Sequence, residues 1–181
     1  MKSTIGEMTG KLLSLTEIIQ MTHQRGEDWA VAHAQRLLQL IEQIGAALVY
    51  DHFALELAVY LHDWGAFPCY YQKDVEHAQR SRQVAETEIL PRLGLPEAAQ
   101  QVLLEAIELH DYRDLRPTRS TEALLLREAD MLEFLGMIGM AREFARGPKD
   151  IEICRQRILE RCSGIRGRIT LPIAREIEAT R

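Results

Sequence analysis

The sequence predicts an all-α protein, and three observations support this fold class. Leucine and alanine dominate its apolar residues while valine is scarce, a composition that favours helices over strands. Apolar residues recur at intervals of three and four, and strict two-residue alternation does not persist. Glycine and proline divide the chain into segments of ordinary helix length. We therefore expect a single-domain helical bundle.

The first two predicted helices are amphipathic and lie on either side of Gly26. Apolar residues spaced three or four apart run over 12–19 in the first helix and over 29–44 in the second. Asp51 is expected to cap a third helix. That helix is expected to end at His62 and Asp63, because a glycine and a proline follow within a few residues.

The rest of the chain is divided by prolines, glycines and residues that cap helices. The helices predicted there run over about 75–90, from 96 to near 110, from 120 to a break at 147–148, from 150 onward and, briefly, from 170 onward. The helix that starts after Ser120 is expected to be the longest. Ser120 and Asp150 are the expected N-caps of their helices, and Thr170 with Pro172 starts the last one.

The predicted helices belong to one unit. No internal repeat, low-complexity run or long linker interrupts the chain. A length of 181 residues suits one domain with its own hydrophobic core. We expect residues 1–181 to form a single domain, with a core over about 25–145 and C-terminal helices over about 150–180 that pack on it.

The charge balance argues against a protein that binds nucleic acid. The 22 Lys and Arg residues are outnumbered by 27 Asp and Glu residues, and the net charge is −5. Eight basic and four acidic residues lie between Arg142 and Arg168. A solvated helical surface is the simpler interpretation of that segment, and a surface for a partner or RNA is the alternative. We expect a small-molecule partner, and association into a homo-oligomer stays open.

The cysteines and the hydropathy indicate a cytoplasmic protein without membrane spans. Cys69, Cys154 and Cys162 form no CxxC pair and are odd in number, which does not suit a secreted disulfide framework. No apolar run approaches the roughly 18 residues of a membrane helix. The first ten residues lack the basic and apolar segments of a signal peptide.

Several imidazoles and carboxylates fall on apolar helix faces. His33 lies on the apolar stripe of its predicted helix, and Asp130 shares a face with Leu126 and Ala129. His110 ends a helix whose inner face is apolar. Burying a carboxylate is costly unless it is paired or coordinated. Metal sites in helical bundles are built from such inward-pointing side chains on separate helices, so the pattern indicates a metal site.

Histidines and aspartates occur along the chain in an ordered series: His33, His62, Asp63, His77, His110 and Asp130. Their local contexts are LHDWG at 61–65, EHA at 76–78, AIELHD at 106–111 and READMLE at 127–133. The series and its contexts resemble those of the HD-domain superfamily of metal-dependent phosphohydrolases, over roughly residues 25–145. The whole series in these contexts is far more specific than a bare His-Asp pair.

The resemblance implies an all-α bundle in which the series binds metal. The residues that would hold a first divalent ion are His33, His62, Asp63 and Asp130. In superfamily members with two further histidines, residues that match His77 and His110 join the aspartate in holding a second ion.

The donor set itself suits hard or borderline divalent ions, because it combines imidazoles and carboxylates without a thiolate. We expect one or two ions per chain, drawn from Mn, Fe, Co, Ni, Mg and Zn. Six candidate ligands exceed the four of a closed structural zinc site. Two divalent ions would outweigh the charges of Asp63 and Asp130 and leave a positive site that suits phosphate.

We expect hydrolysis of a phosphoester or phosphoanhydride in a small nucleotide-like substrate, through a metal-activated water. Asp63 would bridge two ions, Glu76 would transfer a proton, and Arg80 would contact the substrate. Ala66 stands where many catalytic members of the superfamily carry Lys or Arg, after the glycine. Either another residue supplies that contact, or the substrate differs.

Two other functions stay open. A non-catalytic HD module would hold a structural metal and bind a partner or RNA through the basic segment. A di-iron oxygenase of the HD-like type would use the same kind of ligand set for different chemistry.

Overall fold

The computed structural model describes residues 12–146 and 150–181, which form helices joined by loops. No strand occurs among these residues, so the predicted all-α fold class is confirmed. The α-helices are α1 (Leu15–Ile44), α2 (His52–Leu61), α3 (His77–Val84), α4 (Glu97–Leu109), α5 (Thr121–Leu135), α6 (Met137–Arg146), α7 (Ile151–Ile165) and α8 (Pro172–Glu178). A 3-10 turn follows α2 at Trp64–Ala66. A π-helical turn and a second 3-10 turn follow α3 at Ala85–Ile89 and Leu90–Arg92.

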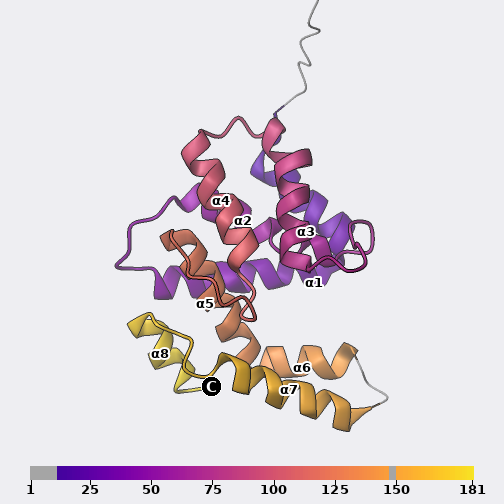
Figure 1. The fold of residues 1–181 in the computed structure, drawn as a ribbon, viewed down its shortest axis with the longest axis vertical. Helices are drawn as coiled ribbons and strands as arrows, with labels where there is room; N and C mark the ends of the chain where they lie inside the picture. Colours follow the sequence, from indigo (N-terminus) through magenta and orange to yellow (C-terminus); the bar gives the residue numbers. More distant parts are fainter. Residues whose placement is uncertain (1–11, 147–149) are drawn as a thin grey trace, which may run out of the picture.

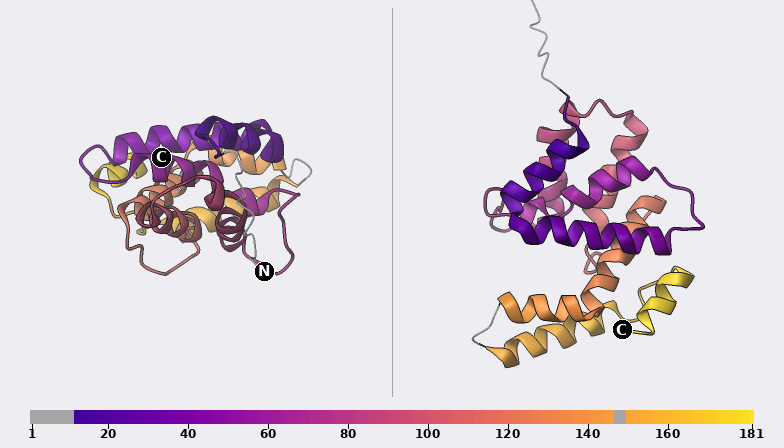
Figure 2. Two further views of the ribbon diagram at one scale, coloured as in Figure 1. Left: turned by 90° about the horizontal axis from the view of Figure 1, so that it is seen from above. Right: turned by 180° about the vertical axis from the view of Figure 1, so that it is seen from behind.

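The helices form two groups that α5 connects (Figure 1). Helices α1 to α4 lie on one side, and α6, α7 and α8 lie on the other, as the view from behind also shows (Figure 2). Helix α5 contacts α1, α2 and α4 as well as α6, α7 and α8. Residues on α5 can therefore serve both the bundle and the C-terminal helices.

Helix α1 is continuous where the sequence predicts two helices, so the predicted break at Gly26 is wrong. The helix does change direction along its length (Figure 2). A Cβ atom at Gly26 would lie 2.2 Å from the ring of Phe67. The glycine therefore serves close packing of an aromatic ring against the helix, and it does not end the helix.

The segment around α2 follows the prediction. Oδ1 of Asp51 accepts a hydrogen bond from the Ala54 amide at 3.0 Å and caps the helix, which ends just before His62. Gly65 follows in the next turn, where a Cβ atom would lie 2.2 Å from the His77 carbonyl oxygen. Only glycine lets this turn and the start of α3 approach so closely.

Two predicted helix boundaries are wrong. The helix predicted over 75–90 is regular only over α3, and its continuation widens into a π turn before Pro91, which cannot donate a backbone hydrogen bond. The helix that starts after Ser120 ends at Leu135, because Gly136 takes an extended conformation with φ −81° and ψ 169°. Helix α1 is therefore the longest in the described part of the chain. The predicted break at 147–148 lies outside the described residues.

The other predicted starts hold. Ser120 accepts a hydrogen bond from the Ala123 amide at 3.2 Å, and Asp150 accepts one from the Ile153 amide at 3.0 Å. Helix α8 begins at Pro172, as predicted. Across residues 12–146 and 150–181, every helix is too short or too polar to span a membrane.

Candidate metal centre

The six predicted metal ligands converge from five segments of the bundle. They are His33 in α1, His62 and Asp63 directly after α2, His77 at the start of α3, His110 directly after α4 and Asp130 in α5. Three of the histidines are buried, and His77 is the most exposed of the four. Ligands at helix ends and on inward helix faces thus meet at one place.

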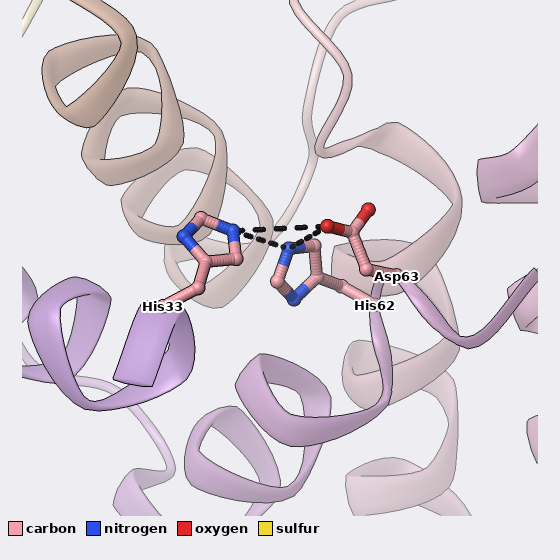
Figure 3. A group of neighbouring side chains, drawn as sticks. All are labelled: His33, His62 and Asp63. Carbon is pink, nitrogen blue, oxygen red and sulfur yellow. Dashed lines mark hydrogen bonds and ion pairs between the residues drawn. The ribbon is translucent and has the colours of Figure 1, made fainter. Parts of the chain in front are cut away.

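One oxygen of Asp63 faces a first pair of histidines (Figure 3). Its Oδ2 lies 3.5 Å from Nε2 of His62 and 3.8 Å from Nε2 of His33. The two Nε2 atoms are 3.2 Å apart. Oδ1 of Asp130 lies 3.5 Å from Nε2 of His33 on the same side. These contacts define the first half of the site.

The other oxygen of Asp63 faces a second pair. Its Oδ1 lies 3.5 Å from Nε2 of His77 and 3.8 Å from Nε2 of His110. The two Nε2 atoms are 3.1 Å apart. Oδ2 of Asp111 lies 3.7 Å from Nε2 of His77. Asp63 therefore stands between two histidine pairs, with one carboxylate oxygen directed at each.

The hydrogen bonds of the first pair leave both Nε2 atoms as bare acceptors. Nδ1 of His62 donates to the Val59 carbonyl at 2.7 Å, and Nδ1 of His33 donates to Oε2 of Glu133 at 2.5 Å. In the neutral rings, two nitrogen lone pairs would then face each other across 3.2 Å. A cation or an added proton must lie between them. Ligands bound about 2.1 Å from one ion lie roughly 3 Å apart, so the spacing suits a shared ion.

Asp130 provides a second sign of a cation. Its Oδ1 is buried and has no hydrogen-bond partner among the described residues. Burial, opposed in part by His33, raises the pKa of this carboxyl to about 8. An ionised carboxylate in such a place needs a positive partner. The donor set and this orphaned oxygen both fit a divalent ion.

The other ionisable groups respond to burial and to each other. Burial lowers the pKa of His62 to about 4, and it also lowers the pKa of His110. Burial alone would raise the pKa of Asp63, but the surrounding histidines outweigh it and hold that pKa far below its usual range. His62 and His110 are thus neutral and Asp63 is charged at neutral pH, as metal ligands require. Burial opposes protonation of His33, but its bond to Glu133 and the charges of Asp130 and Asp63 prevail and raise its pKa.

Glu133 orients His33 from the far side of the ring. It is buried, and its Oε1 accepts a hydrogen bond from Arg36 at 2.5 Å while its Oε2 accepts one from Arg142 at 2.7 Å. Burial opposes ionisation of Glu133, but the bonds to His33 and the two arginines prevail and lower its pKa to about 2. A carboxylate bonded to the remote nitrogen of a ligand histidine fixes the ring and raises its basicity.

The loop after α4, which carries His110 and Asp111, is held by two arginines. Arg127 donates to the carbonyl of Leu109 at 2.5 Å and to that of Arg116 at 2.9 Å. Arg168 donates to the carbonyls of Tyr112 and Asp114. The guanidinium of Arg127 therefore binds this loop.

An open cleft of about 270 Å³ leads to the site. Asp63, His77 and Asp130 lie in its wall. The other lining residues are Trp29, Ala66, Asp111, Tyr112, Arg113, Phe134, Arg142 and Arg161. The position of Ala66 offers no charge, whereas Arg142 and Arg161 bring positive charge from α6 and α7.

Arg80 and Glu76, which are predicted to contact the substrate and to transfer a proton, lie in different surroundings. Nε of Arg80 donates to the Tyr70 carbonyl at 2.8 Å, and Arg80 does not line the cleft. Glu76 is exposed, and its Oε2 lies 3.5 Å from Arg113. Their roles stay predictions. His23 and His52 are exposed and belong to none of the metal-competent groups among the described residues.

The sequence interpretation missed the arginines that serve the site. Arg142, Arg161 and Arg168 belong to the basic segment that reads as a solvated surface. The excess of basic residues in that segment was the available signal. Which of them turn inward depends on how the C-terminal helices pack on α5, and periodicity does not reveal that.

Comparisons with known proteins support the fold. No protein-family model matches the chain, and no curated protein sequence matches it. A crystal structure described as a predicted HD superfamily hydrolase from an uncultured Thermotogales bacterium is similar, with a TM-score of 0.59 and 22% sequence identity. The match covers 90% of this chain and 93% of the other. The chain therefore shares the fold of that structure.

Proposed function

We propose that this protein is a metal-dependent phosphohydrolase of the HD superfamily, which hydrolyses a phosphoester or phosphoanhydride bond in a small nucleotide-like substrate. The observation that carries the proposal is the position of Asp63, whose two carboxylate oxygens face separate histidine pairs. His33, His62 and Asp130 would hold a first divalent ion with Asp63. His77 and His110 would hold a second. The similarity to a predicted HD hydrolase supports the same reaction class.

Divalent ions bound there would supply positive charge for phosphoryl oxygens and would lower the pKa of a bound water. The protein residues do the remaining work. Glu133 keeps the His33 ring in the orientation that directs Nε2 at the site. The Val59 and Ile107 carbonyls do the same for His62 and His110.

The reaction itself is a simple displacement. The oxygen of a water molecule forms a bond to phosphorus and the water gives up a proton. The bond from phosphorus to the leaving oxygen breaks, and the leaving oxygen takes up a proton. Glu76 is our candidate for moving that proton, because it adjoins His77 and its Oε2 lies 3.5 Å from Arg113, which lines the cleft. Arg113, which lines the cleft beside Asp111, is placed to contact a phosphoryl oxygen.

The test is release of inorganic phosphate from a panel of nucleoside mono-, di- and triphosphates and p-nitrophenyl phosphate. The purified protein is assayed with added Mn, Co or Ni and, as a control, with excess EDTA. We expect turnover of at least one substrate that EDTA abolishes. Bound metal without turnover of any substrate would contradict the proposal and favour the non-catalytic module. Oxygen consumption by an iron-loaded sample would favour the oxygenase instead.

A further inference from the structure

The cleft beside the metal centre has a basic wall that supplies no metal ligand. Arg142 from α6 and Arg161 from α7 line the cleft together with Asp63, His77 and Asp130. The two arginine side chains are 21% and 18% exposed. They are therefore packed on most sides and open on the side of the cleft.

The Arg161 guanidinium is held in place before any ligand arrives. Its Nη2 donates to Oε2 of Glu143 at 2.9 Å, and its Cζ lies 4.6 Å from the centre of the Phe134 ring. Glu143 is buried and does not line the cleft. Guanidinium has five N–H donors, so one ion pair from behind leaves donors for a ligand in front. Such preorganisation favours binding because little side-chain entropy is lost.

Arg142 is arranged in the same way. Its Nη1 donates to the buried Glu133 at 2.7 Å, and its Cζ lies 5.5 Å from the centre of the Trp29 ring. Both arginines thus combine a buried carboxylate behind them, an aromatic ring beside them and the cleft in front. Two fixed guanidinium groups on one wall suit an oxyanion such as phosphate.

The opposite side of the site has the contrary charge. Asp111 and Arg113 also border a hollow of about 450 Å³ between the start of α3 and the loop after α4. The charged residues that line this hollow are Glu76, Glu108, Asp111, Asp114, Arg113 and Arg116. Its acidic residues outnumber its arginines, so an additional anionic group is favoured at the wall of α6 and α7 and disfavoured in the hollow.

We propose that Arg142 and Arg161 form an anion subsite, which binds a second phosphate of the substrate next to the phosphoryl group that is hydrolysed. This inference rests on the proposed function and narrows it. The preferred substrate class is then a phosphoanhydride, such as a nucleoside diphosphate or triphosphate, rather than a phosphomonoester with a neutral leaving group.

The experiment compares steady-state kinetics of the Mn-loaded full-length protein with ADP, ATP and p-nitrophenyl phosphate. Arg161→Gln is expected to raise KM for ADP and ATP about tenfold, the effect of one lost charge-assisted hydrogen bond. KM for p-nitrophenyl phosphate should stay within about twofold, because that substrate has no second phosphate. Arg161→Lys keeps the charge and should raise KM for ADP only about threefold. Mn content per chain should not change.

Arg157→Gln is the matched control. Arg157 lies on the same helix and its Nη1 is 3.5 Å from the same Glu143, but its side chain is 60% exposed and does not line the cleft. It should leave every KM unchanged. Circular dichroism checks the fold of each variant, and Arg161→Lys carries the test where Arg161→Gln does not fold. We avoid Arg142 because it also contacts the glutamate that orients His33.

Binding of the α,β-methylene analogue of ADP to Mn-loaded protein, measured by calorimetry, gives a result that does not depend on turnover. Kd is expected to rise about tenfold in Arg161→Gln and to stay unchanged in Arg157→Gln. Equal KM changes for all substrates, a preference of the unmodified protein for phosphomonoesters, or unchanged analogue binding would overturn the anion subsite while leaving metal-dependent hydrolysis intact. If no substrate is turned over but binding of the analogue still depends on Arg161, the result would contradict the proposed hydrolase activity and support the anion subsite.

Discussion

The two carboxylate oxygens of Asp63 lie near different pairs of histidines. Oδ2 faces His33 and His62, and Oδ1 faces His77 and His110. A histidine that follows a helix end, as His62 and His110 do, uses the last turn of that helix to fix its ring, since Nδ1 donates to a carbonyl three residues earlier. Simple local rules thus orient two of the four imidazoles.

Asp63→Ala is expected to remove both ions, because it deletes the one residue common to the two halves. Loss of a supporting residue typically lowers metal affinity 10–100-fold, so loss of this ligand should lower it by more than about 100-fold. Metal content per chain, measured by plasma mass spectrometry after gel filtration, checks this. His23→Ala is the control, because His23 is exposed and lies outside the metal-competent groups. Equal metal loss in the two variants would contradict the assignment of ligands.

At the residue scale, apolar helix faces indicated His33, His110 and Asp130. The full set of six side chains that meet in the structure was predicted from the resemblance to the HD-domain superfamily. The structure adds Glu133, which binds the remote nitrogen of His33. The hydrogen bonds that Arg36 and Arg142 donate to Glu133 could not be predicted. These contacts join α1, α5 and α6, and sequence spacing says nothing about which side chains meet across helices.

At the scale of elements, the C-terminal segment holds the loop after α4. Glu128 on α5 accepts hydrogen bonds from the Thr170 amide at 2.7 Å and the Thr170 hydroxyl at 2.6 Å, which anchors the segment between α7 and α8. Arg168 in that segment donates to the carbonyls of Tyr112 and Asp114. The position of His110 therefore depends on residues almost sixty positions later in the chain.

Arg168→Gln is expected to weaken the second ion and to spare the first. The loop that follows His110 would lose two hydrogen bonds, and a change in such supporting contacts lowers metal affinity by about tenfold or more. Titration calorimetry with Mn measures the two affinities separately. Arg166→Gln is the control, because the Arg166 side chain is exposed nearby. Unchanged affinity for both ions in Arg168→Gln would contradict a positioning role.

The contact between α6 and α7 should make stability depend on pH. Burial opposes ionisation of Glu143, but Arg161 and Arg157 hold its pKa below the ordinary value of 4.5. A carboxyl whose pKa is lower in the folded state than in the unfolded state stabilises the protein at pH values above its unfolded-state pKa. That stabilisation is lost as the pH falls from there through the folded-state pKa. Glu143→Gln should therefore lower the free energy of unfolding by about 1.5 kcal/mol at pH 7.

The difference between Glu143→Gln and the unmodified protein should shrink as the pH falls below 4.5. Urea unfolding followed by circular dichroism at several pH values measures it, with EDTA present throughout. Glu152→Gln on α7 is the control, because Glu152 pairs with its exposed neighbour Arg155. A difference that stays constant from pH 7 to pH 3 would contradict the ionised pair.

Helix starts were easier to predict than helix ends. Asp51, Ser120 and Asp150 cap helices through their own side chains, so the signal is local. Glycine is ambiguous because it ends one helix at Gly136 but lies inside α1 at Gly26, where the Phe67 ring packs against it. That difference depends on a partner forty residues away.

At the scale of the whole molecule, the candidate metal centre combines residues of the bundle with Asp130 of α5. Helix α5 also connects the bundle to the C-terminal helices (Figure 1). Helices α1 to α5 and the residues that directly follow them supply every candidate ligand, whereas α6 and α7 supply Arg142 and Arg161 of the cleft. The fold class could be predicted because helical periodicity and composition agree along the chain. The basic wall of the cleft, formed by Arg142 and Arg161, could not be predicted, because it depends on how the C-terminal helices pack against the bundle.

The most direct measurement is a crystal structure of the Mn-soaked protein with anomalous data collected at the Mn absorption edge. Our account predicts two anomalous peaks, one beside His33, His62 and Asp130 and one beside His77 and His110, with Asp63 between them. A single peak, or no peak next to Asp63, would contradict it.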